Sequence, residues 1–144
     1  MSVLSAVIII FCLMEITNVI ILYSKPNFKY GNGIGCFKFY EESKKDENTH
    51  LFVRYMINWV AGTKLIFILL LLLIALFGTE TLKLYGVLLM ILSISTYYFK
   101  LHPIIKKLDE NNQINPKGYS NKLIVMITTF IIMFSIAALL SLVL

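Results

Sequence analysis

Glu15 is the residue whose type and position in this chain most strongly suggest chemistry. It lies inside an apolar stretch, residues 2–23, that is long enough to cross a bilayer as a helix. A carboxylate at that depth is costly unless it is neutralised, paired or hydrated, so an ionisable residue inside a membrane span is by default a functional-site hypothesis. The chemistry that it could support is proton binding or ion pairing.

Three polar side chains of this first stretch share one helix face. Cys12, Glu15 and Asn18 are spaced i, i+3 and i+6, which places them within a stripe about 60° wide at about 100° per residue. Because lipid offers no hydrogen-bond partner, we expect the stripe to face other helices.

Lys64 is a second ionisable residue inside an apolar stretch, residues 55–77. At about 1.5 Å per residue, Lys64 lies on the order of 10 Å inside one boundary of the bilayer core, and Glu15 lies roughly 12 Å inside the same boundary. We therefore predict an intramembrane Glu15–Lys64 pair, with Asn18 or Asn58 as a further hydrogen-bond partner. The alternative, given equal weight, is that Lys64 extends to the membrane surface while Glu15 is protonated.

The elements that must position these residues are four apolar spans. The chain has 144 residues, of which 58% are hydrophobic, whereas soluble domains are typically about 45–50% apolar. The predicted spans are residues 2–23, 55–77, 82–99 and 123–144. We predict an all-α integral membrane four-helix bundle with antiparallel up-down topology, formed by a single transmembrane domain over residues 1–144.

Basic residues set the predicted orientation. Eleven of the thirteen lysines and arginines lie in two loops, residues 24–54 and 100–122, whereas Lys83 lies at the opposite end and Lys64 inside a span. The positive-inside rule places both loops in the cytoplasm and both termini on the other side. The isoleucine- and lysine-rich composition suits a prokaryotic cell membrane.

The first loop contains two recognisable segments. Gly31, Gly33 and Gly35 alternate in a turn-rich stretch that lacks the dinucleotide-binding fingerprint, so we expect a flexible or interface-hugging turn. Residues 36–50 combine aromatic and charged side chains at helical spacing. This segment is either an interfacial helix or a solvated connector.

The sequence predicts no enzyme. It contains no catalytic set, no cofactor motif and no metal-ligand cluster, and the two cysteines, Cys12 and Cys36, are not expected to form a disulfide. The net charge of +5 is not assigned to nucleic acid, because the basic residues flank apolar spans, where they suit lipid headgroups.

Two functions remain open. A lone glutamate in the first of four short spans is similar to the small multidrug exporters, and this resemblance implies proton and cation binding at Glu15. The long first loop, Lys64 and the absence of an aromatic-lined site in the third span depart from that family. The first prediction is a small transporter or channel-like bundle. The alternative is a non-catalytic subunit or scaffold that forms a homo-oligomer or joins a partner membrane subunit, and whose cytoplasmic loops bind a partner or anionic lipid.

Overall fold

The computed structural model describes residues 2–30 and 33–143. Within these ranges the chain is all-helical, with 84% helix and no strand. The elements are α1 Val3–Ser24, the 3₁₀ helix η1 Ile34–Cys36, α2 Lys38–Ser43, α3 Glu47–Phe77, α4 Glu80–Lys100, α5 His102–Glu110 and α6 Tyr119–Val143. The all-helical fold is therefore confirmed.

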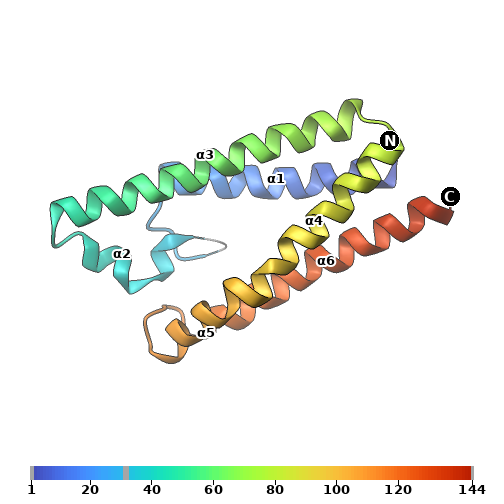
Figure 1. The fold of residues 1–144 in the computed structure, drawn as a ribbon. Coiled ribbons are helices and arrows are strands. Elements are labelled where there is room, and N and C mark those ends of the chain that lie inside the picture. Colours follow the sequence, from blue (N-terminus) through green and yellow to red (C-terminus); the bar gives the residue numbers. More distant parts are fainter. Residues whose placement is uncertain (1, 31–32, 144) are drawn as a thin grey trace.

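Among the described residues, four helical segments are long and apolar enough to cross a membrane. They are α1, α3, α6 and the combined segment Glu80–Glu110, in which α5 continues from α4. This matches the predicted number of spans, while insertion in a bilayer and its direction stay predictions. The two termini and the α3–α4 link lie at one end of the molecule, and α2 and α5 lie at the other, here called the loop end (Figure 1).

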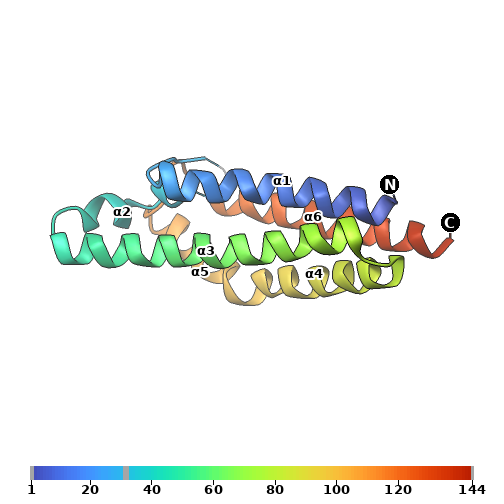
Figure 2. The same ribbon diagram turned by 90° about the horizontal axis from the view of Figure 1, so that it is seen from above.

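The helices form two pairs. α1 packs mainly against α3, and α4 packs mainly against α6. The pairs lie close together at the end with the termini and diverge toward the loop end, as Figure 1 shows, and Figure 2 shows the same arrangement from above. Phe11 of α1 joins the pairs, because its ring meets those of Phe130 and Phe134 on α6 edge to face, with centroids 5.2 and 5.4 Å apart.

A seven-residue repeat sets the register of α1 against α3. The Ser5 hydroxyl donates to the Ala75 carbonyl at 2.9 Å, and the Cys12 thiol lies 3.8 Å from the Ile68 carbonyl. Continuing the same antiparallel register brings Val19 opposite Ala61, and both are buried. Small residues in this repeat let the two backbones approach closely enough for side chains to reach main-chain carbonyls.

α3 begins eight residues before the predicted span. Asp46 explains the early start, because its carboxylate accepts a hydrogen bond of 2.8 Å from the Thr49 amide at the first turn. At about 1.5 Å per residue, the 31 residues of α3 extend well beyond an apolar core of about 30 Å. Residues 36–50, expected to be either an interfacial helix or a solvated connector, are mostly helical and are divided between α2 and the first turn of α3.

The two long loops are bound to each other. Phe37 and Ile114 form an isolated antiparallel bridge. On either side of it, the Lys38 amide donates to the Gln113 carbonyl at 2.9 Å, and the Asn115 amide donates to the Cys36 carbonyl at 2.8 Å. The loop end is therefore an ordered unit rather than two independent connectors.

Gly35 explains part of the glycine pattern in the first loop. A Cβ atom at this position would lie 2.0 Å from the Asn27 carbonyl oxygen, so the turn needs a residue without a side chain. Gly31 lies outside the described residues. The close approach of two backbone segments, rather than a phosphate-binding loop, accounts for Gly35.

Asp109 links α5 to the start of α6. Its carboxylate accepts hydrogen bonds from the Gly118 amide at 3.0 Å, the Ser120 amide at 3.0 Å and the Ser120 hydroxyl at 2.7 Å. Ser120 itself does not cap this helix, because α6 begins one residue earlier, at Tyr119, and the carboxylate of a neighbouring helix satisfies its first amides.

We predict that Asp109→Asn lowers the free energy of unfolding by about 1–3 kcal/mol, because an amide group cannot accept all three hydrogen bonds and one donor is left unpaired. Equilibrium unfolding in mild detergent, followed by circular dichroism, measures the change. The matched control is Glu110→Gln at the next, exposed position, which should change stability by less than about 0.5 kcal/mol. Equal effects of the two substitutions would contradict the role of Asp109.

Candidate functional site: a charge pair between α1 and α3

The polar stripe of α1 faces α3. Cys12 is fully buried against α3, and both Glu15 and Asn18 lie next to Lys64, which α3 contributes. The expectation that this stripe turns toward another helix is confirmed. The register described above is the cause, because it places Lys64 level with the turn of α1 that carries Glu15 and Asn18.

Glu15 and Lys64 form an ion pair. The Lys64 Nζ atom lies 2.5 Å from Glu15 Oε2 and donates a hydrogen bond of 2.7 Å to Asn18 Oδ1. The Lys64 side chain is 26% exposed and the Glu15 side chain 16% exposed. Lys64 is turned toward α1 rather than extended to the loop end, so the geometry corresponds to the first of the two alternatives raised by the sequence.

The two contacts of Lys64 differ in kind. Glu15 Oε2 is buried, and within the described residues no hydrogen bond to it has acceptable angles, although the ammonium group lies close to it. Lys64 thus meets Glu15 as a charge and meets Asn18 as an aligned hydrogen-bond donor. Coulomb attraction depends on the separation of the charges, so at this N–O distance the two groups attract each other even without an aligned hydrogen bond.

Asn58 does not belong to this cluster. It was predicted as an alternative partner, but it is exposed on α3, and Asn18 occupies the predicted role. The reason is helical geometry. Asn58 precedes Lys64 by six residues, which places it about 120° away around α3.

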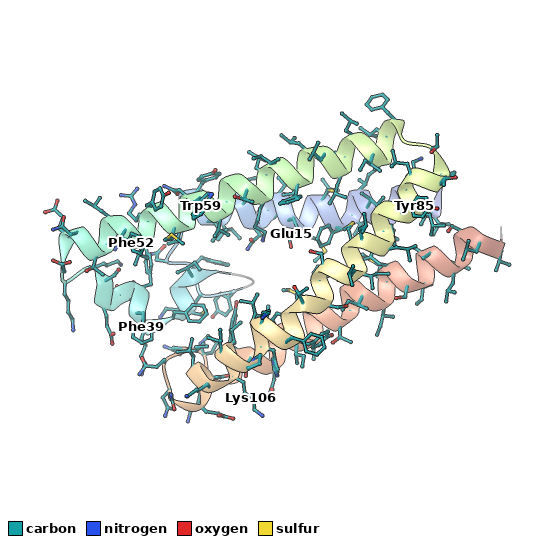
Figure 3. All side chains as sticks on the ribbon, in the orientation of Figure 1. Glu15, Phe39, Phe52, Trp59, Tyr85 and Lys106 are labelled. Carbon is teal, nitrogen blue, oxygen red and sulfur yellow. The ribbon has the colours of Figure 1, made fainter. Side chains whose placement is uncertain are left out.

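The position of Glu15 is visible in Figure 3, which labels it near the middle of α1, while Phe52 and Trp59 lie toward the loop end of α3. A charge at mid-helix is expensive in an apolar medium, and an opposite charge nearby offsets part of that cost. Once paired in this way, the carboxylate is covered by the Lys64 ammonium group. The arrangement can fix the register of two helices.

The long helices have exposed basic residues near the loop end. Each long helix contributes one exposed basic residue there: Lys25 at the end of α1, Arg54 on α3, Lys100 at the end of α4 and Lys122 on α6. We call these four residues the basic collar. The loops also carry six acidic residues, at 41–47 and 109–110, and the Asp109 carboxylate lies at the start of α6, against Ser120 and two residues before Lys122.

Cys36 is buried within the loop end. Burial raises the pKa of its thiol from 9.0 to about 11, so the thiol is protonated at neutral pH and reacts slowly. Both cysteines are free and buried. Labelling of the native Cys36 would therefore report unfolding of the loop end, not the side of the membrane on which it lies.

Comparison with known proteins does not assign a function to this site. The described residues contain no group of three or more His, Cys, Asp or Glu side chains arranged to hold a metal ion. No family matches the chain, and neither a curated protein nor a solved structure matches it. Four long apolar helices are compatible with the class of integral membrane proteins, and the proposals below rest on the residues themselves.

Sequence reasoning missed two features of the structure. One is the role of Asp109, whose partners lie 9 and 11 residues away in an irregular segment. The other is a cavity of about 330 Å³ beside Lys64 and Asn18. Neither leaves a periodic signal in the sequence, because each depends on how the first loop and α5 fold back.

We predict that Glu15→Gln and Lys64→Met each destabilise the protein by about 1–3 kcal/mol, because each leaves the other charge without its partner. The double variant should lose less than the sum of the two single losses. Equilibrium unfolding in detergent at fixed pH gives the free energy of unfolding of the wild type, the two single variants and the double variant. Strict additivity would show that the two charges do not stabilise each other.

The matched control is the exposed pair of Glu41 and Lys44, whose atoms are 2.8 Å apart with side chains 59% and 41% exposed. The same substitutions there, Glu41→Gln and Lys44→Met, should give a coupling of no more than about 0.5 kcal/mol, because water screens both charges.

Proposed function

We propose that this chain is an integral membrane protein that serves as a non-catalytic scaffold or subunit, and that its basic collar holds the headgroups of anionic lipids. The observation that carries the proposal is the collar of Lys25, Arg54, Lys100 and Lys122, with one cation on each spanning helix and all four exposed. The loops then lie in the cytoplasm and both termini on the opposite side.

Three further observations support this proposal. Basic residues beside a membrane attract anionic lipids by about 1 kcal/mol each, and the collar lies at the ends of the apolar segments, where headgroups would be. Tyr55 and Trp59 are exposed on α3 close to Arg54, and amphipathic rings favour the membrane interface. The bridge between Phe37 and Ile114 makes the loop end an ordered surface, which suits docking better than a flexible connector does.

The charge pair is the reason to rank this function above transport. A proton-coupled carrier needs an acid that binds and releases its ligand during turnover, whereas Glu15 is held against Lys64. Lys64 would also repel a cationic substrate at that site. In a scaffold, the pair has a sufficient role in setting the register of α1 and α3.

We expect the protein to unfold at a higher temperature in nanodiscs with about one-third phosphatidylglycerol than in phosphatidylcholine alone, because anionic headgroups neutralise the collar. Replacing the four collar residues with glutamine should abolish the difference, and about 0.5 M salt should reduce it. The matched control replaces Lys44, Lys45, Lys106 and Lys107, which removes the same charge from exposed positions farther out. If both quadruple variants behave alike, the collar is not the binding site.

Transport is the second candidate, and the cavity that reaches Lys64 and Asn18 favours it. In sealed proteoliposomes with a pH gradient and a dye for membrane potential, we expect the same low proton and cation flux from wild type and Glu15→Gln. Vesicles without protein give the baseline flux. Proton-coupled flux that is present in wild type and absent in Glu15→Gln would contradict the scaffold function and support transport.

A further inference from the structure

A half-open cavity lies between α1 and α3 on the loop-end side of the charge pair. Its volume is about 330 Å³, within the range of about 300–1,000 Å³ that small-molecule sites occupy. Asn18 and Lys64 form one end. The walls are apolar, and include Leu22 of α1 and Met56 and Val60 of α3.

The cavity runs from the loop end toward the charge pair. Phe52 also lines it, twelve residues before Lys64 on α3, a separation of about 18 Å along the helix. Ile34, from the short helix η1, lines it as well. The folded first loop therefore forms part of a wall that two helices alone would leave open.

At the polar end of the cavity, Lys64 and Asn18 have N–H groups that make no hydrogen bond to another described residue. An ammonium group has three N–H donors. Within the described residues, Lys64 donates to Asn18 Oδ1 and meets the Glu15 carboxylate as a nearby charge, so at least one of its N–H groups is without an acceptor. The Asn18 amide nitrogen likewise donates no hydrogen bond to another described residue. Unpaired hydrogen-bond donors at the end of an apolar cavity favour a ligand that carries a hydrogen-bond acceptor.

Charge narrows the ligand class further. An anionic head would meet the Glu15 carboxylate, which already lies against Lys64, and a cationic head would meet the Lys64 ammonium. A neutral carbonyl oxygen can accept hydrogen bonds from the unpaired N–H groups of both Lys64 and Asn18 without disturbing the ion pair. At about 30 Å³ per atom, close to the share of one liquid water molecule, the cavity has room for about eleven non-hydrogen atoms.

We propose that this cavity binds a neutral amphiphile whose carbonyl oxygen accepts hydrogen bonds from Lys64 and Asn18, and whose apolar body lies along Met56 and Val60. The carbonyl can belong to an ester, as in a lipid fragment, or to a quinone. The ligand enters with its polar end first from the loop end. This site is independent of the basic collar, which lies at the surface and selects anionic headgroups.

The test is photo-crosslinking of the full chain in phosphatidylcholine nanodiscs with a short alkyl ester that carries a diazirine in its chain. We expect label on α3 between Phe52 and Val60, mapped by mass spectrometry. Methyl octanoate should compete for labelling at least five-fold better than decane, which has a similar size but no acceptor. Octanoate and octylammonium should compete no better than decane, because each brings a charge toward the pair.

Two matched variants locate the site. Val60→Trp fills the cavity from an exposed position of α3 and should reduce labelling at least five-fold, whereas Leu69→Trp, also exposed on α3 but outside the cavity, should leave labelling unchanged. Circular dichroism confirms that both variants are folded. Lys64→Met should remove the preference of the site for the ester over decane even where label remains.

The outcomes distinguish the ligand sources. Stronger competition by a short-chain alkyl benzoquinone than by methyl octanoate assigns the site to quinones, and the reverse assigns it to lipid esters; either result supports the proposal. Equal competition by decane, or equal labelling of wild type and Val60→Trp, overturns it and leaves only non-specific contact with lipid chains. Loss of the phosphatidylglycerol effect in the collar variant does not bear on this result.

Discussion

The structure depends on the register between α1 and α3. In an apolar medium, two helices gain little from hiding hydrophobic surface, so close packing and polar contacts decide how they align. Ser5 and Cys12 contact main-chain carbonyls of α3 two turns apart, at Ala75 and Ile68. A further step in the same register brings Glu15 and Asn18 to Lys64. A slip of one residue would turn Lys64 about 100° away and leave two charges in apolar surroundings.

That register also explains why the ion pair and the cavity are neighbours. α1 and α3 carry small or slim residues where they cross closely, and bulkier apolar residues toward the loop end, where Met56, Val60 and Leu22 line an open volume. Lys64 lies at the boundary between these regions. Its ammonium group contacts α1 and also has an unpaired N–H group next to the cavity. A single side chain therefore contributes both to helix alignment and to a candidate binding site.

The loop end follows a different rule, because its backbone groups are not satisfied within helices. The bridge at Phe37 and Ile114 and the three hydrogen bonds to Asp109 supply partners for amides that would otherwise be unpaired. Four exposed basic residues and the exposed rings of Tyr55 and Trp59 lie on the helices and helix ends near this region. The two ends of the molecule thus use different interactions: close helix packing in the apolar part, and side-chain capping and loop pairing where water or headgroups would be present.

The sequence by itself determined the number of long apolar helices and the shared face of Cys12, Glu15 and Asn18, and it predicted that Glu15 and Lys64 lie together. These follow from composition and helical periodicity, which are local properties of the chain. Only the tertiary structure decided that Asn18 rather than Asn58 joins Lys64, that Asp109 caps α6, and that Ile34 helps to enclose a cavity. Each of these depends on the relative rotation of helices or on the path of a loop, and hydrophobic periodicity does not encode contacts between residues far apart in the chain.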